Sequence, residues 1–331
     1  MKKYTVLITG GTGSFGKEAI NFLLKKKLNI KKIIIFSRDE FKQNELAKIH
    51  ESNKKVLRFF LGDVRDKNRL MIAMDQVDIV IHAAALKQVP ATEYNPYEAI
   101  KTNILGAQNV AEAAAYSNVK KVIALSSDKA TAPVNLYGAT KLVSDKIFVS
   151  ANNMFASKKT KFSVVRYGNV FGSRGSVVPL FIEQKKSKIF TVTNEKMTRF
   201  SLTLNHAVEF VFLSLERMLG GEIFVPKLSS YKILDLLEAI AGKNSKIKIV
   251  GSRIGEKLHE ELISVNDLSN IYEFKDYFVI LPDNNLVKWD TINSIKKING
   301  KKCSHNFSYN SLDNKNYLSI SQLKEILKKY N

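Results

Sequence analysis

Short apolar runs alternate with longer amphipathic segments through the first half of the chain. The apolar runs are rich in Val and Ile and predict buried strands, whereas the amphipathic segments repeat their apolar positions with the period of a helix. Because parallel strands need crossover connections, this alternation predicts a doubly wound α/β sheet with the strand order 3-2-1-4-5-6. The predicted strands cover residues 4–9, 32–36, 56–61, 77–82, 121–126 and 163–167, and the predicted helices cover 16–26, 41–50, 96–116 and 137–152.

The regular alternation fades after about residue 170. Helical patterns still occur at 205–219, 232–241 and 321–329, whereas the segment 283–316 is rich in Asn and Lys and carries no clear pattern. No low-complexity linker or internal repeat separates an independent module. We therefore expect a smaller C-terminal α/β lobe that packs against the sheet and closes a cleft.

The composition is that of a globular protein, with 331 residues of which 45% are hydrophobic and 25% charged. Wholesale disorder is therefore excluded. The single cysteine, Cys303, has no partner for an intramolecular disulfide. The five histidines are scattered, and His259-Glu260-Glu261 lacks the second histidine of a zinc-binding HExxH motif. The sequence therefore predicts no metal site.

Neither the N-terminal segment nor the charge distribution indicates a membrane or nucleic-acid partner. The N-terminal apolar run is shorter than a signal-peptide core, and no run approaches the roughly 18 apolar residues that span a bilayer. The 52 basic and 31 acidic residues give a net charge of +21, but the lysine doublets are spread over the whole chain. Spread charge favours a solvated surface over a polyanion-binding patch. We expect a cytoplasmic protein.

A glycine motif follows the first predicted strand and precedes a helix: Gly10, Gly13 and Gly16 have the spacing GxxGxxG. Glycines permit a tight turn and close backbone approach to a pyrophosphate, whose charge the helix N-terminus stabilises. This context predicts a Rossmann-like dinucleotide site. Its other expected contacts are Thr12, Ser14 and Phe15 in the loop, Asp63 and Val64 after the third strand, Ala83, Ala84 and Lys87 after the fourth, and Ser126 at the end of the fifth.

The residues that follow the second strand indicate which dinucleotide is bound. An NAD enzyme usually has an acidic residue at the end of this strand, where it binds the ribose 2′-hydroxyl. Here Ser37 and Arg38 stand at the strand end and Lys42 follows one helical turn later, whereas Asp39 falls past the strand. A hydroxyl and two cations suit a 2′-phosphate. We therefore predict NADP rather than NAD.

A Tyr-x-x-x-Lys pair provides candidate chemistry, because Tyr137 and Lys141 lie on one face of a predicted helix. A lysine ammonium beside a phenol stabilises the phenolate and lowers the pKa of the tyrosine. Tyr137 could then accept a proton from a substrate hydroxyl while the attached carbon gives hydride to a nicotinamide. Both residues are also expected to contact the cofactor.

These motifs together resemble the extended short-chain dehydrogenase/reductase superfamily over residues 4–170. The pair Asp128-Lys129, within the segment SDKATAPVNLYGATK, narrows the resemblance. It is similar to the inverting UDP-N-acetylglucosamine 4,6-dehydratases of the pseudaminic acid pathway, whereas the usual hexose dehydratases carry Asp-Glu here. Further segments that look like this family are HAAALKQVPATEYNPYEAIKTNILGAQNV, RYGNVFGSRGSVVPLF, MTRF, GGEIFVPK and GSRIGEKLHE.

The resemblance implies a role for each catalytic residue. Tyr137 would act in oxidation at carbon 4, Asp128 would protonate the departing carbon 6 hydroxyl, and Lys129 would remove the carbon 5 proton. NADP would be tightly held and recycled, and its reduced form, NADPH, would return hydride to carbon 6. A basic Lys129 must be partly neutral, which burial and the nicotinamide charge would favour and Asp128 would oppose. The proton assignment within the Asp128–Lys129 pair therefore stays open.

The resemblance also implies the substrate contacts and the assembly. Residues 1–170 would form the NADP-binding domain with the catalytic residues, and residues 171–331 mainly the substrate-binding lobe, with some segments returning to the first domain. The protein would be a homo-oligomer, with a hexamer suggested by the resembling enzymes and the two long helices as the interface. The expected contacts of UDP-N-acetylglucosamine are Lys87, Lys129, Asn169, Val178, Arg199, Arg253 and Glu256.

Three alternatives remain at this point. A UDP-hexose 4-epimerase would explain the glycine motif and the Tyr137–Lys141 pair but would leave Asp128-Lys129 without a function. A retaining 4,6-dehydratase differs only in the face from which carbon 5 is reprotonated, which residue types do not reveal. A non-catalytic NADP-binding regulator would commonly lack part of the catalytic set, whereas this chain carries all four residues.

Overall fold

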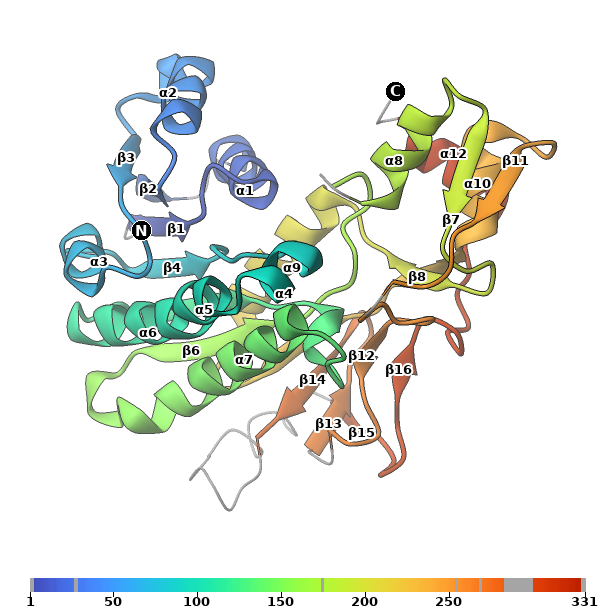
Figure 1. Cartoon of the computed structure of the whole chain (residues 1–331). Coiled ribbons are helices and arrows are strands. Elements are labelled where there is room, and N and C mark those ends of the chain that lie inside the picture. The colour runs from blue at the N-terminus through green and yellow to red at the C-terminus, as the bar shows by residue number, and fades with distance from the viewer. Residues whose placement is uncertain are drawn as a thin grey trace.

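Six parallel strands form the first part of the main sheet. They are β1 (Tyr4–Thr9), β2 (Ile30–Ser37), β3 (Leu57–Leu61), β4 (Ile79–His82), β5 (Lys121–Leu125) and β6 (Lys161–Val165). The computed structural model describes residues 3–26, 29–173, 176–253, 255–267, 270–282 and 300–328. The strand order β3-β2-β1-β4-β5-β6 confirms the predicted order (Figure 1), and the strand ends lie within two residues of the predicted ones. The predicted doubly wound α/β fold is confirmed.

The C-terminal half of the chain extends the same sheet. Strand β9 (Ile223–Pro226) pairs in parallel with β6. Three antiparallel strands follow in the order β14 (Tyr277–Leu281), β13 (Asn270–Glu273) and β15 (Lys301–Lys302), which gives a ten-stranded sheet. The chain therefore crosses back from the second half into the sheet that carries the N-terminal motifs. The functional division at residue 170 stays a prediction.

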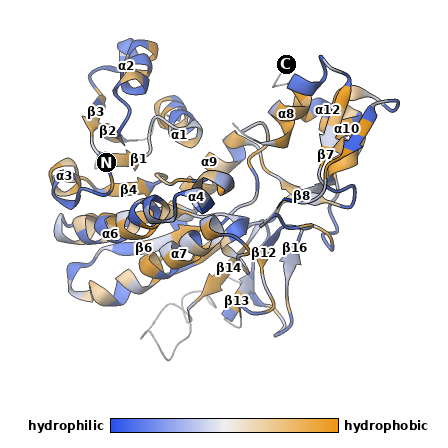
Figure 2. Cartoon of the chain, viewed as in Figure 1, coloured by the Kyte–Doolittle hydropathy of each residue, from blue (hydrophilic) through white to orange (hydrophobic). Residues whose placement is uncertain are grey.

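Helices cover both faces of the sheet, which explains why its strands are continuous apolar runs. Helix α1 (Ser14–Lys25) packs against α9 (Leu204–Arg217), and α6 (Gly106–Tyr116) lies between α3 (Lys67–Ala73) and α7 (Leu136–Met154). In Figure 2, hydrophobic and hydrophilic residues occur on the same helices, as expected where one face contacts a sheet. Helix α2 (Glu40–Ile49) and the short turns η1 (Glu51–Asn53) and η4 (Ala156–Lys158) complete this half.

The helix predicted over 96–116 is interrupted. It begins as α5 (Pro96–Ala99), continues as the π-helix η2 (Ile100–Leu105) and becomes α-helical again only in α6. The amide of Asn103 turns toward the loop after β4, where its Oδ1 accepts from Leu86 N at 2.8 Å and its Nδ2 donates to Leu86 O at 2.9 Å. A π-helical turn leaves the apolar pattern readable as one helix, which is why the sequence did not reveal it.

A second, smaller core lies beside the sheet. Buried side chains such as Val178, Phe181, Phe190, Leu236 and Leu323 form it. The helices predicted at 205–219, 232–241 and 321–329 are present with ends shifted by one or two residues, although 329 lies outside the described residues. Three helices that the sequence analysis did not predict are α3, α4 (Val89–Tyr94) and α8 (Val177–Gln184). The remaining elements are β7 (Ile189–Val192), β8 (Thr198–Ser201), β10 (Ser229–Lys232), α10 (Ile233–Ala241), β11 (Lys246–Ile249), β12 (Glu261–Ile263), β16 (Tyr309–Asn310) and α12 (Ile320–Leu327).

Two further observations bear on the sequence analysis. Among the described helices, none is both long and apolar enough to cross a membrane. Part of the segment without a clear pattern, 283–299, lies outside the described residues, and its remaining portion contains β15 and β16.

Candidate active site

The glycine loop closes tightly onto the end of β4. Gly10 has a positive φ of 65°, and its amide donates to Phe36 O at 2.8 Å. A Cβ atom at Gly10 would lie 2.9 Å from Ala84 N, so a larger residue would push the loop away from β4. Helix α1 begins directly after Gly13, which leaves the amides of its first turn available for an anion. The loop therefore fits a dinucleotide pyrophosphate.

The other predicted loop residues lie around the same turn. Thr12 is buried, whereas Ser14 and Phe15 are half-buried at the start of α1. A Cβ atom on Gly16 would lie 2.3 Å from Gly11 O, which shows how closely α1 packs against the loop. Ala83 and Ala84 face the loop, and their amides donate to Thr9 Oγ1 at 3.2 and 3.3 Å.

The residues predicted to bind a 2′-phosphate form one charged cluster at the end of β2. Ser37 is buried, and its Oγ accepts from Gln43 Nε2 at 3.0 Å. The Arg38 guanidinium lies 3.5 Å from the Asp63 carboxylate. The Lys42 ammonium contacts the carboxylate of Asp39, which also caps α2 by accepting from Lys42 N at 3.0 Å.

Val64 and Lys87, both predicted to contact the cofactor, occupy different environments. Val64 is buried beneath α6. The two are in close contact, since a Cβ atom added to Gly106 of α6 would lie 2.8 Å from the Val64 side chain. Lys87 is exposed on the loop between β4 and α4. Its side chain therefore has access to a ligand above the loop, whereas Val64 can contribute mainly through its backbone.

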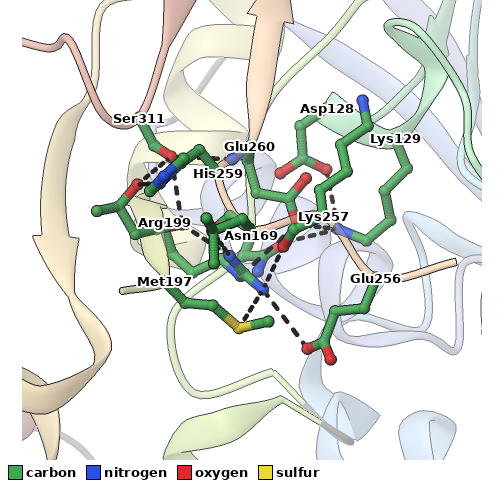
Figure 3. A network of polar contacts seen from close by, with 12 residues as sticks. Asp128, Lys129, Asn169, Met197, Arg199, Glu256, Lys257, His259, Glu260 and Ser311 are labelled. Atoms are coloured by element: carbon green, nitrogen blue, oxygen red, sulfur yellow. Dashed lines mark hydrogen bonds and ion pairs between the residues drawn. The ribbon is translucent and has the colours of Figure 1, made fainter. Parts of the chain in front are cut away.

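The short turn η3 (Asp128–Ala130) follows β5 and holds the predicted acid–base pair. Asp128 is 1% exposed, and its Oδ1 accepts from Lys129 Nζ at 3.1 Å and from Ser127 Oγ at 3.0 Å. The Lys129 ammonium also donates to Asn169 Oδ1 at 3.1 Å and to Glu260 Oε1 at 3.2 Å (Figure 3). Three oxygens therefore fix the position of this ammonium, one from the preceding residue and two from distant parts of the chain.

Helix α7 packs directly onto η3. Asn135 caps this helix by accepting from Gly138 N at 2.8 Å. A Cβ atom on Gly138 would lie only 2.2 Å from Lys129 O, so glycine at this position allows the contact. This packing of α7 on η3 places Tyr137, at the start of α7, beside the Asp128–Lys129 turn. The structure thus brings the predicted acid–base pair and the predicted tyrosine together.

Lys141 lies on the same helix but has different partners. Its ammonium donates to Leu125 O at 2.7 Å, and within the described part of the chain it is not hydrogen-bonded to Tyr137. Burial lowers the pKa of Lys141, and the nearby Asp145 carboxylate opposes that shift. Ser126 Oγ donates to Asp145 Oδ2 at 2.9 Å, and Arg166 forms an ion pair with the same oxygen at 3.3 Å. Lys141 is therefore anchored beneath the end of β5.

The electrostatics of Tyr137 differ from the expectation. Burial raises the pKa of Tyr137, and the side chains that oppose this shift are Lys129 and Ser127. Lys141, which the spacing predicted as the stabilising cation, instead faces the Leu125 carbonyl. The difference arises because the first turn of α7 lies against η3, which brings Lys129 near the phenol.

The carboxylates around Lys129 favour its charged form. Burial alone would lower the pKa of Lys129, but the carboxylates of Asp128 and Glu260 outweigh burial and raise it. This direction opposes the partial neutrality that a base requires, and the role of Lys129 as the base stays a prediction. Burial and the charge of Glu260 together raise the pKa of Asp128, although Lys129 opposes them. Asp128 is thus suited to hold a proton.

Sequence reasoning missed Glu260 as a site residue. It noted Glu260 only as part of an incomplete zinc motif, yet the carboxylate is buried and contacts Lys129. It also missed Asn103, whose amide donates to Thr140 Oγ1 at 3.0 Å and so ties the loop after β4 to α7. The family-like segment that ends at Glu260 was the available signal for the first residue. No local signal marks Asn103.

Arg199 is more enclosed than expected for a phosphate ligand. It is 6% exposed, and its guanidinium donates to the carbonyls of Leu258 at 3.0 Å and Lys257 at 3.2 Å. It also lies 3.5 Å from Glu256 Oε1 and 3.6 Å from Glu260 Oε1 (Figure 3). The guanidinium therefore joins two carboxylates to the 257–258 backbone, and its contact with a diphosphate stays a prediction.

The other predicted substrate residues are spread around the lobe. Arg253 is exposed, and its amide donates to Glu256 Oε2 at 3.2 Å. Asn169 contacts Lys129 and so belongs to the acid–base cluster. Val178 is buried in the second core at the start of α8, so its side chain contributes to packing. Within the described residues, no group of three or more His, Cys, Asp or Glu side chains is arranged to hold a metal ion.

Comparison with known proteins places the chain in a family. The model of the polysaccharide biosynthesis protein family matches residues 6–282. The UDP-N-acetylglucosamine 4,6-dehydratase (inverting) of Campylobacter jejuni strain 81-176 is 54% identical over 327 residues, which cover 97% of this chain and 96% of the relative. The UDP-glucose 4-epimerase of Rickettsia bellii strain OSU 85-389 is 46% identical over 285 residues, covering 84% and 83% of the two chains.

Solved structures agree with this placement. The crystal structure of Pen from Bacillus thuringiensis has a TM-score of 0.88 at 37% identity and covers 99% of each chain. The dTDP-glucose 4,6-dehydratase DesIV from Streptomyces venezuelae, at 20% identity and a TM-score of 0.69, shares the fold. Together with the glycine loop and the Tyr137–Lys141 pair, these matches show that the chain belongs to the polysaccharide biosynthesis protein family of extended short-chain dehydrogenases/reductases.

Proposed function

We propose that this protein is a configuration-inverting UDP-N-acetylglucosamine 4,6-dehydratase. The product would be UDP-2-acetamido-2,6-dideoxy-β-L-arabino-hexos-4-ulose. The observation that carries the proposal is the Asp128–Lys129 pair, in which Asp128 is buried, Lys129 is half-buried and 3.1 Å separates Oδ1 from Nζ. The pair packs against the first turn of α7, which contains Tyr137. Oxidation alone would not need this pair. The name of the Campylobacter relative supports the same activity.

The residues would divide the chemistry as follows. Tyr137 accepts the proton of the carbon 4 hydroxyl as carbon 4 is oxidised to a ketone. The ketone makes the proton on the neighbouring carbon 5 acidic. Lys129 and Asp128 then act as one titrating pair, which takes the carbon 5 proton and gives a proton to the departing carbon 6 hydroxyl, so that water leaves. When bound, the nicotinamide supplies the hydride chemistry and returns to its starting oxidation state. Final protonation of carbon 5 from the opposite face gives inversion.

NADP is the proposed cofactor, tightly held and recycled. The absence of a side chain at Gly10, where a Cβ atom would lie 2.9 Å from Ala84 N, allows a pyrophosphate to approach the backbone closely. Arg38 and Lys42, beside Ser37, would bind the 2′-phosphate in exchange for their present contacts with Asp63 and Asp39. Tighter binding of NAD than of NADP would overturn this assignment.

The second lobe would bind the nucleotide part of the substrate. Arg253 is the exposed cation best placed for a diphosphate, and Glu256 would hold the uridine ribose hydroxyls. Arg199, Asn169, Val178 and Lys87 complete the proposed set. Reversing the charge at Arg253 should raise the KM for the substrate strongly, and an unchanged KM would indicate a surface role.

Assembly, location and pathway belong to the same proposal. We propose a cytoplasmic homo-oligomer with the helices of 96–116 and 137–152 at the interface, and the resemblance suggests a hexamer. The 4-keto product would feed an aminotransferase on the route to pseudaminic acid, used for flagellin glycosylation or for surface glycans. A mass of about one protomer in light scattering would contradict the oligomer.

Proton NMR of the purified protein with UDP-N-acetylglucosamine in deuterated water tests the function directly. We expect a new methyl signal on a 4-keto sugar, deuterium at carbon 5 and the L-arabino configuration. The D-xylo configuration would keep the dehydratase and exclude inversion. UDP-N-acetylgalactosamine without a methyl signal would indicate a 4-epimerase, the name carried by the Rickettsia relative. No change with NADP supplied would indicate another substrate or a binding protein.

A further inference from the structure

Glu260 connects three charged groups of the acid–base centre. Its Oε1 lies 3.2 Å from Lys129 Nζ and 3.6 Å from Arg199 Nε, and its side chain is 4% exposed. Its other carboxylate oxygen, Oε2, is buried and has no hydrogen-bond partner among the described residues. The Oδ2 atom of Asp128 is also buried without a hydrogen-bond partner among the described residues. Two buried carboxylates therefore flank one ammonium, and each keeps one oxygen unused.

The backbone around Glu260 is fixed independently of the cluster. Its amide donates to Ser311 Oγ at 2.9 Å, and its carbonyl accepts from Ser311 N at 2.8 Å. Ser311 Oγ lies 2.7 Å from Thr198 Oγ1, which also contacts His259 Nδ1 at 2.8 Å (Figure 3). Neighbouring segments from β8 and from the end of β16 thus hold the residue, and its side chain points at Lys129.

The two carboxylates have unequal surroundings. Glu260 forms ion pairs with two cations, Lys129 and Arg199, and the charge of Lys257 also acts on it, whereas Asp128 forms an ion pair with Lys129. Burial would raise the pKa of Glu260, but Lys129 and Arg199 outweigh it and hold that pKa below its usual range. The pKa of Asp128 is raised instead. Two neighbouring carboxyl groups whose pKa values are pushed apart are the arrangement that separates a charged group from a proton donor.

We propose that Glu260 is a positioning residue of the acid–base centre, which anchors Lys129 and carries the negative charge that leaves Asp128 as the proton donor. The inference rests on the proposed dehydratase activity and adds a second carboxylate, beside Asp128, to its acid–base centre. Glu260 acts through its neighbours: it holds the Lys129 ammonium between itself, Asp128 and Asn169, where the amine can face the sugar. Arg199 fixes Glu260 from the other side.

The substitution Glu260→Gln tests the charge while keeping the shape. Without the negative charge, Asp128 should lose its proton at lower pH, so the alkaline limb of the kcat profile moves to lower pH. Lys129 should also become neutral at lower pH, so the acid limb moves the same way. We expect the whole profile to shift by about one pH unit or more, with kcat reduced by about 10- to 100-fold and KM changed much less.

Two variants make the result specific. Glu261→Gln removes the same charge one residue further along the chain, where the carboxylate is near Lys257 rather than Lys129, and should leave the profile in place. Glu260→Asp keeps the charge on a shorter side chain and should retain the pH optimum while losing part of kcat. A Glu260→Gln profile at the wild-type position, or an equal shift in Glu261→Gln, would overturn the proposal.

A measurement without substrate separates this proposal from the proposed function. The rate at which acetic anhydride modifies Lys129, followed by mass spectrometry across pH, reports the neutral amine in the resting protein. In Glu260→Gln the rate at a fixed pH below the pKa should rise by about tenfold, because a fall of about one pH unit in the pKa of Lys129 gives about ten times more neutral amine. If the rate rises but wild-type protein forms no methyl product, the positioning role holds and the dehydratase assignment fails. An unchanged rate would reject the role of Glu260 whatever the substrate.

Discussion

The glycine loop and the acid–base centre are built in opposite ways. The loop is a continuous segment from Gly10 to Gly16, and its close contacts are with backbone atoms such as Ala84 N. The acid–base centre joins Lys129 to Glu260, 131 residues further along the chain. The loop therefore works by shape and by uncharged amides, whereas the centre works by charges that distant segments bring together. Substitutions in the first should act sterically and those in the second chemically.

The two regions also differ in which polar groups they leave unpaired. In the loop, the amide of Gly10 is paired with Phe36 O, whereas the amides in the first turn of α1 are available as donors. In the centre, Asp128 Oδ2 and Glu260 Oε2 are buried without hydrogen bonds in the described structure. Unpaired buried acceptors are costly, so their presence indicates a site that functions with a ligand.

The largest effect is expected for Lys129→Ala. Removing the Lys129 amine deletes the base of the proposed pair and leaves two buried carboxylates without their shared cation, so dehydration should fall by about 10³-fold or more. NADP binding should be retained, because the glycine loop is unchanged. NMR of the methyl product and fluorescence titration of NADP would measure the two properties. Lys146→Ala, at an exposed position on α7, is the matched control, and near-normal turnover of Lys129→Ala would remove the proposed role.

A smaller, steric effect is expected for Gly10→Ala. The added Cβ combines a φ of 65° with a contact of 2.9 Å to Ala84 N, so the loop must move away from β4. We expect NADP affinity to fall by about tenfold or more and the free energy of unfolding to fall by about 1–3 kcal/mol. Gly242→Ala is the control, because Gly242 also has a positive φ of 87° but nothing within 4 Å of the added atom. Equal losses of NADP affinity in both variants would contradict the steric explanation.

The pH dependence of stability should reveal the buried His82. Burial, with a contribution from the Lys141 ammonium, lowers the pKa of His82 to about 3. The unfolded chain binds this proton below about pH 6.5 and the folded chain does not, so His82 makes the free energy of unfolding fall as pH falls. The slope approaches about 1.4 kcal/mol per pH unit.

Urea denaturation at pH 7 and pH 5 would measure this contribution as a difference between variants. His82→Gln should lose less stability than wild type over that interval, whereas His305→Gln, at an exposed position, should behave as wild type. Identical slopes for His82→Gln and wild type would mean that the imidazole is protonated in the folded protein. The hydrogen bond of 2.8 Å between Thr9 Oγ1 and His82 Nδ1 would then need a donating nitrogen.

The smallest effect is expected for Arg38→Ala. The side chain is 53% exposed, so its interaction with a 2′-phosphate is screened by solvent. We expect a loss of about three- to tenfold in NADP affinity with little change for NAD. Lys48→Ala, an exposed lysine on the same helix as Lys42, is the control for overall charge. An equal loss for both dinucleotides would indicate that Arg38 does not contact the 2′-phosphate.

Much of the fold was readable because its signals are local. The strands β1 to β6 are apolar runs, and their order followed from crossover handedness alone. The π-helix η2 was missed because a single wider turn does not alter the apolar pattern on either side of it. The short helices α3, α4 and α8 were missed because six to eight residues give too few turns for a helical period to stand out.

The sequence by itself determined the glycine loop, the sheet order and the residue types of the acid–base pair, because each depends on neighbours within a few positions. Only the tertiary structure decided which charges those residues face. The contact of Gly138 with Lys129 O places Lys129 beside Tyr137, and the segment ending at Glu260 supplies the second carboxylate. Proton affinities inside a protein are set by burial and by charges within a few ångströms, and distance in space is fixed by packing rather than by position in the chain.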